Sequence, residues 1–149
     1  METIKKISLK IGKSKIKKYN FTPERLDCSS KVPNYLRQFF SNDLLIFESV
    51  FILLLDQSNT SIGYAKISQG GICSSIVDIK IVCKYVVDSL AQGVILCHNH
   101  PSGNLTPSQG DINVTNKLKE ALKYLDTKLI DHVILTENSY YSFAENGDL

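Results

Sequence analysis

Residues 49–55, SVFILLL, constrain the fold more than any other stretch of this chain. Successive side chains of a β-strand point to opposite faces of a sheet, so apolar residues at nearly every position require cover on both faces. A strand of this kind belongs inside a layered structure, with other elements packed above and below it. The length of 149 residues is enough for one domain with a sizeable core.

The other apolar patterns alternate between strand and helix. Residues 57–60, QSNT, favour a turn that joins two strands into a hairpin, and Gly93 is expected to end a helix. Beyond the hairpin, strands and helices follow one another, which predicts a single α/β domain with a mixed sheet flanked by helices. The expected strands are 49–56, 61–68, 94–97 and 128–135, with an edge strand at 3–11 and a short last strand within 139–149; the expected helices are 32–40, capped by Ser29 or Ser30, 76–91 and 106–126.

Charge is distributed unevenly along the chain. Residues 1–18 carry seven lysines and one glutamate, whereas the rest carries ten basic and fourteen acidic side chains. Such a basic arm, from Lys5 to Lys18, can make a weak contact with nucleic acid. A solvated terminus or edge strand protected by lysines is the favoured alternative, because no aromatic residue alternates with these lysines. The arm and a short helix form an N-terminal extension, residues 1–43.

Composition also predicts the compartment. No apolar run approaches the roughly 18 residues of a membrane span, and the N-terminus lacks the apolar segment and cleavage site of a signal peptide. We therefore expect a cytoplasmic protein. Four widely spaced cysteines without a C-x-x-C pair predict buried free thiols rather than disulfides or a zinc knuckle. They are Cys28, Cys73, Cys83 and Cys97.

The stretch HNHPSGNLTPSQGD, residues 98–111, combines residue types that bind zinc. In extended backbone, residues i and i+2 face the same way, so His98 and His100 can converge at the end of a strand. The loop after them can return the chain so that Asp111 supplies an oxygen as third ligand. A water in the fourth position would make such a site catalytic rather than structural.

Each part of this stretch also has an ordinary explanation. A lone histidine after a strand is more often a surface or core residue. Residues 108–111 have nearly the form of a capping box, with Ser108 at the N-cap and Asp111 at the third helical position, where its side chain reaches back. We favour the metal site because two of only three histidines lie in one short pattern, and because a capped helix can itself orient Asp111.

Hydrolysis at a metal site also needs a general base. Among the six glutamates, Glu48 stands directly before the apolar strand, where a charge is costly unless it is used; a place at the solvent boundary is its ordinary explanation. Ser108 could donate a hydrogen bond to the oxyanion of a tetrahedral intermediate. His132 could support a ligand or line the cleft, but a packed strand histidine is the favoured interpretation.

The pattern His98-x-His100-x7-Ser108-x2-Asp111, with Glu48 upstream, resembles the JAMM motif of JAB/MPN zinc metallopeptidases. The longer string at 98–111, with LIDHVIL and YYSFAENG downstream, is similar to the RadC branch of that group. The resemblance implies a JAB/MPN domain at 44–149 with a curved mixed sheet flanked by helices, an architecture like that of cytidine deaminases.

The resemblance also implies the roles of the site residues. His98, His100 and Asp111 would be ligands of Zn²⁺, Glu48 the general base and Ser108 the oxyanion donor. One departure concerns the helix start, where RadC-like proteins usually have a Pro-Arg-Glu-like segment and this chain has residues 79–81, Ile-Lys-Ile.

Two functions are therefore compared. The leading hypothesis is a zinc metallopeptidase that cleaves an amide or isopeptide bond in a peptide or protein substrate. The alternative is a non-catalytic, metal-containing module that acts in a DNA-associated process through the basic arm. Either function is compatible with an oligomer, and neither involves a membrane.

Overall fold

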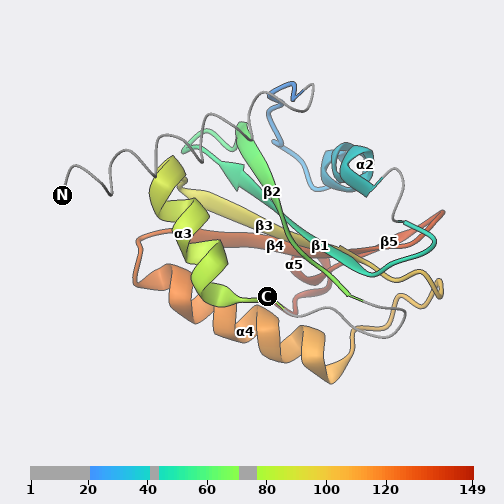
Figure 1. Cartoon of the computed structure of the whole chain (residues 1–149). Helices are drawn as coiled ribbons and strands as arrows, with labels where there is room; N and C mark the ends of the chain where they lie inside the picture. The colour runs from blue at the N-terminus through green and yellow to red at the C-terminus, as the bar shows by residue number, and fades with distance from the viewer. Residues whose placement is uncertain (1–20, 41–43, 71–76) are drawn as a thin grey trace.

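A five-stranded mixed sheet organises the computed structural model, which describes residues 21–40, 44–70 and 77–149 (Figure 1). The edge strand expected at 3–11 and the basic arm lie outside these residues. The strands are β1 (Ser49–Leu55), β2 (Ser61–Gln69), β3 (Gly93–Asn99), β4 (Lys128–Leu135) and β5 (Tyr140–Ser142). The helices are α2 (Lys31–Arg37), α3 (Ile79–Ser89), α4 (Gln109–Lys123) and α5 (Phe143–Asn146), with a short 3-10 helix, η1, at Gln38–Phe40.

The strand order β2-β1-β3-β4-β5 places β3 at the centre of the sheet. Strand β3 pairs antiparallel with β1 and parallel with β4. The parallel pair needs a crossover, which α4 supplies. The predicted single α/β domain with a mixed sheet flanked by helices is thereby confirmed.

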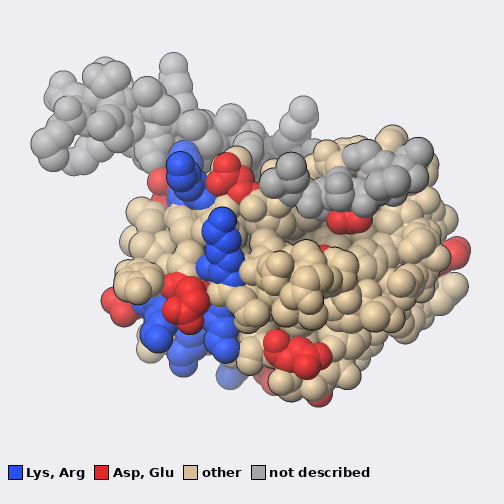
Figure 2. All heavy atoms as spheres, turned by 90° about the horizontal axis from the view of Figure 1, so that it is seen from below, with Lys and Arg blue, Asp and Glu red and all other residues tan. Residues whose placement is uncertain are grey.

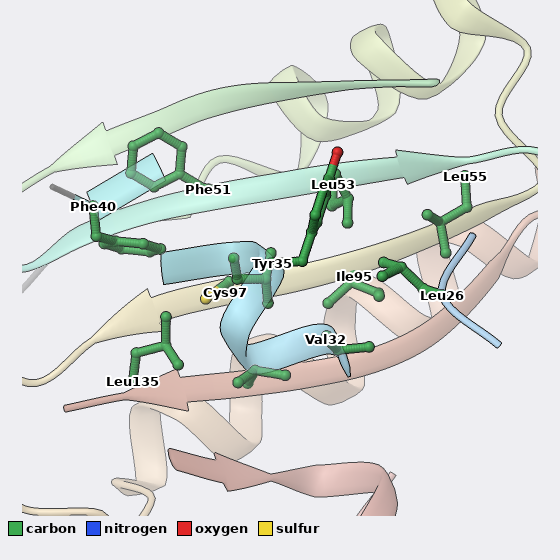
Figure 3. Packing of buried hydrophobic residues seen from close by; sticks show 12 residues of the cluster. Leu26, Val32, Tyr35, Phe40, Phe51, Leu53, Leu55, Ile95, Cys97 and Leu135 are labelled. Atoms are coloured by element: carbon green, nitrogen blue, oxygen red, sulfur yellow. The ribbon is translucent and has the colours of Figure 1, made fainter. Parts of the chain in front are cut away.

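Strand β1 is buried at all seven positions, as its sequence predicts. Its alternate residues Phe51, Leu53 and Leu55 join a core that also contains side chains of α2, and Figure 3 shows this packing. The residues between them, such as Ile52, join a second core with side chains of α3 and α4. Figure 1 shows α2 on one side of the sheet and α3 and α4 on the other.

Helix α2 belongs to the first core although it lies in the proposed N-terminal extension. Leu36 is fully buried there, and Tyr35 is nearly so. The Arg37 guanidinium donates hydrogen bonds to three backbone carbonyls of the turn at 136–139. The domain boundary between residues 43 and 44 stays a prediction, but this helix packs as part of the sheet's own core.

Several local expectations need correction. Helix α3 ends at Ser89, followed by Leu90 with a left-handed backbone, so Gly93 does not end it. Gly93 instead begins β3, where an added Cβ would lie 2.9 Å from Cγ1 of Ile130. Ser30 is the N-cap of α2 but makes no side-chain capping bond. Residues 143–146, expected within a strand region, form α5.

The cysteines follow the prediction of buried free thiols only in part. Cys28, Cys83 and Cys97 are free thiols, but Cys28 is exposed rather than buried. Of the three cysteines that the structure describes, Cys97 alone is fully enclosed, and this burial raises the pKa of its thiol well above the usual range. Cys73 lies outside the described residues.

Within the described ranges, no helix is long and apolar enough to cross a membrane.

We expect Leu36→Ala to lower the free energy of unfolding by about 2–5 kcal/mol, because it leaves a cavity between α2 and the sheet. Urea denaturation followed by circular dichroism measures this change. Asn34→Ala, on the exposed side of the same helix, is the control and should change stability by less than about 0.5 kcal/mol. Equal effects of the two substitutions would show that α2 is not part of the core.

Candidate metal centre

The central strand delivers two histidines to one point. His98 is the second-last residue of β3, is 3% exposed, and lies between Val50 of β1 and Ile134 of β4. The backbone N–H of His100 continues the pairing by donating to the Leu135 carbonyl. Extended backbone therefore turns both imidazoles to the same face, as predicted, with 3.0 Å between their Nε2 atoms.

The N-terminus of α4 supplies the carboxylate. Ser108 is the N-cap and Asp111 the third helical residue, and they form the capping box expected from the sequence. This geometry aims the Asp111 carboxylate at the histidines, with Oδ1 3.1 Å from His98 Nε2 and Oδ2 3.7 Å from His100 Nε2. One potential ligand atom from each of His98, His100 and Asp111 lies within 4.8 Å of the others.

A chain of buried hydrogen bonds determines which nitrogen of His98 carries a proton. The Thr115 hydroxyl donates to the Asp111 carbonyl, so it must accept from Nδ1 of His132, 2.6 Å away. His132 is neutral, because its burial lowers its pKa well below the usual range. Its Nε2 must therefore accept from Nδ1 of His98, at 2.8 Å, which leaves Nε2 of a neutral His98 unprotonated.

His100 is oriented in the same way by the loop. Its Nδ1 lies 2.6 Å from the carbonyl oxygen of Asn104, which can only accept, so Nδ1 carries the proton. With both imidazoles neutral, the two Nε2 lone pairs lie 3.0 Å apart beside a carboxylate, an arrangement that a proton or a metal cation among them stabilises. Ligands at tetrahedral zinc lie about 3.3 Å from one another, so this donor set fits Zn²⁺.

Asp111 is suited to bind a cation because it stays ionised. Burial alone would raise its pKa, but the hydrogen bond and positive charge of the His98 imidazole in its protonated form outweigh burial, and a bound cation would act in the same direction. The hydroxyl and backbone N–H of Ser108 both donate to Oδ2 at 2.7 Å. Together these partners hold the pKa of Asp111 well below its ordinary value.

Glu48 reaches the same site from the residue directly before β1, the strand that pairs with β3. A cavity of about 390 Å³ opens beside the histidines, and Glu48 lines it together with Ser108 and Asp111. The sequence alone does not place Glu48 near residues 50 positions away, so this is the contribution of the β1–β3 pairing. All five predicted site residues thus line one cavity, and their individual roles stay predictions.

Sequence reasoning gave the support behind His98 only as the less favoured alternative for His132. It favoured His132 as a packed strand residue, and the ring does stack on Phe143 with centroids 4.6 Å apart. The same ring also bonds His98, and Thr115 was not considered at all. A signal was available, because Thr115 lies four residues after Asp111 and so one helical turn farther along the same face of α4.

Comparison with known proteins agrees with this geometry. Residues 26–148 match the model of the RadC-like JAB domain. The chain belongs to the RadC-like JAB family. The matched range of this JAB/MPN domain includes α2, which packs in the same core as the sheet.

The relatives that match this chain carry the name UPF0758 protein, which states no activity. A UPF0758 protein of Flavobacterium johnsoniae is 49% identical over 100 residues, which are 67% of this chain and 44% of that protein. A UPF0758 protein of Thermotoga maritima is 36% identical over 144 residues, or 97% of this chain and 64% of that protein. The chain therefore spans less than two thirds of the length of these relatives.

We expect the purified protein to bind about one zinc ion per chain and His100→Ala to lose it, because two of the three ligands cannot hold the ion in water. Metal analysis after dialysis measures the zinc content. Asn116→Ala, on the exposed face of α4, should keep full occupancy. Full zinc occupancy in His100→Ala would contradict the ligand set.

We expect Thr115→Val to weaken zinc binding by about 10- to 100-fold, because His132 loses the acceptor that orients it toward His98. Competition with a chelating dye gives the affinity. Thr127→Val is the matched control: it also removes buried hydrogen bonds, to the carbonyls of Ala91 and Leu125, but these lie outside the cavity. Equal zinc affinities of the two variants would argue against the supporting role of Thr115.

Proposed function

We propose that this chain is a zinc-dependent hydrolase of the JAMM metallopeptidase type, which cleaves an amide or isopeptide bond. The observation that carries the proposal is the pair of histidine Nε2 atoms, 3.0 Å apart, facing the Asp111 carboxylate. These atoms border a cavity that Glu48 also lines. Membership of the RadC-like JAB family supports a JAB/MPN module, and the peptidase activity is the step proposed beyond it.

In this proposal the three protein ligands leave the fourth coordination position of the ion open for water or substrate. His98, His100 and Asp111 would hold the ion, and three protein ligands are the usual number in catalytic zinc sites. Zinc, when bound, lowers the pKa of water and polarises a carbonyl oxygen. The fully bonded chain from His98 through His132 to Thr115 keeps the first ligand rigid.

Glu48 and Ser108 have separate tasks in this mechanism. Glu48 would take a proton from the attacking water and deliver it to the leaving amine. Ser108 would donate a hydrogen bond to the developing oxyanion. In the structure its hydroxyl donates to Asp111 Oδ2, so the hydroxyl must turn from the carboxylate toward the substrate to serve in this way.

A DNA-associated role without catalysis is less well supported. The basic arm at residues 5–18 lies outside the described part of the chain, so its contact with nucleic acid stays a prediction. On the face shown in Figure 2, basic side chains gather on one side and stand among carboxylates. Elsewhere in the described part of the chain, Lys84 of α3 forms an ion pair with Asp88. This mixture is typical of a solvated surface rather than of a track for phosphates.

We expect Glu48→Gln to keep zinc and to reduce hydrolysis by about 10²- to 10⁴-fold, because the amide cannot accept the proton. The assay uses the zinc-loaded full chain with a fluorogenic peptide library and isopeptide-linked peptides. Glu120→Gln, an exposed glutamate of α4, is the control and should leave the rate unchanged. Undiminished hydrolysis by Glu48→Gln, or loss of its zinc, would contradict the role of Glu48.

A further inference from the structure

Asn99 stands between the two histidines and points to the opposite face of the sheet. Its side chain is fully buried, where an unsatisfied amide would be costly. Oδ1 accepts from the backbone N–H of Ser49 at 2.8 Å. Nδ2 donates to the carbonyls of Leu44 at 2.9 Å and Phe47 at 2.8 Å. The amide oxygen and both amide hydrogens are therefore used on one backbone segment, residues 44–49.

This segment carries Glu48, which the sheet alone does not hold. Strand β1 begins one residue later, and its pairing with β3 starts at Val50, opposite His98. On the side of β2, the Glu48 carbonyl accepts from the Gly70 N–H. On the side of β3, Asn99 bonds the residues directly before and after Glu48, namely Phe47 and Ser49.

The turn before Glu48 has little apolar packing of its own. Leu45 is 55% exposed and Ile46 is 59% exposed, so these large side chains contribute little to holding the turn in place. Leu44 does pack against the first core, and the Asn99 amide bonds its carbonyl. The amide thus closes the turn at both ends, at Leu44 and at Phe47.

We propose that Asn99 positions Glu48 against the metal centre. The inference rests on the proposed function and names a further residue for that reaction. Successive residues of extended backbone face opposite ways, so His98 and His100 reach the metal side while Asn99 reaches the segment behind it. Residues 98–100 then hold the two histidine ligands and also the segment that carries Glu48. The covalent geometry of these three residues sets the distance between that segment and the histidines.

The test uses the full chain loaded with Co²⁺, whose visible absorption reports the surroundings of the ion. Asn99→Ala should keep one metal ion per chain and shift the absorption maximum in the same direction as Glu48→Gln. In the Glu48→Gln background, Asn99→Ala should add no further shift, because it acts through Glu48. Hydrogen exchange of the Ser49 amide should become at least about tenfold faster, with exchange in β4 unchanged.

Two further variants separate positioning from general stability. Arg37→Met removes three side-chain bonds to backbone carbonyls of another turn, so it is the control for a general loss of stability that leaves the Glu48 segment untouched. It should leave the Co²⁺ spectrum unchanged. Asn99→Asp keeps an acceptor for the Ser49 N–H and loses both donors, so it gives the same test if Asn99→Ala does not fold.

Each contrary result has a distinct meaning. The positioning role would be overturned if Asn99→Ala shifted the spectrum equally in the wild-type and the Glu48→Gln backgrounds. It would also be overturned if hydrogen exchange of the Ser49 amide stayed unchanged. Either result would leave the hydrolase proposal intact. If Glu48→Gln itself alters neither the spectrum nor hydrolysis, the role of Glu48 in the proposed function fails, and the inference about Asn99 fails with it.

Discussion

Backbone pairing along both edges of β3 is the constraint on which the rest of this structure depends. The strand is buried at all seven positions and is hydrogen-bonded to β1 on one side and β4 on the other. Its carboxyl end is therefore the one place where β1, β4 and the loop into α4 meet. Residues placed there can receive support from three elements at once, and His98 and His100 lie at that point.

The same backbone alternation separates binding from support. His98 and His100 face the cavity, whereas Asn99 faces the first core and bonds the segment before β1. The capping box has a comparable double use, because Ser108 both begins α4 and orients Asp111. In the capping box, the bonds that hold the start of α4 are the same bonds that fix the Asp111 carboxylate beside the histidines.

Burial of polar groups is tolerated here because their bonds are complete. The side chains of His132 and Thr115 are at most 1% exposed. Both ring nitrogens of His132 and the Thr115 hydroxyl have hydrogen-bond partners. An incomplete chain would cost the desolvation of every unpaired group, while a complete one permits only one tautomer of His98. The electrostatics of the site thus follow from hydrogen bonding that is set several residues away from the proposed ligands.

Sequence alone determined the features that repeat over short distances. The unbroken apolar run of β1 indicated cover on both faces, the i, i+2 histidines indicated convergence, and the Ser108–Asp111 spacing indicated a capped helix. Each depends on the geometry of one strand or one turn, which residues a few positions apart suffice to specify. The end of α3 was misplaced because the sequence suggested that Gly93 ends the helix. In the structure Leu90 takes the left-handed backbone conformation that ends it.

Only the tertiary structure decided which of these faces meet. The β1–β3 register brings Glu48 to the cavity from 50 residues away, and helix packing brings Thr115 to His132. The bonds of Asn99 to residues 44–49 are equally remote in sequence. Local periodicity states which way a side chain points but not what lies opposite it, because that depends on how separate elements pack.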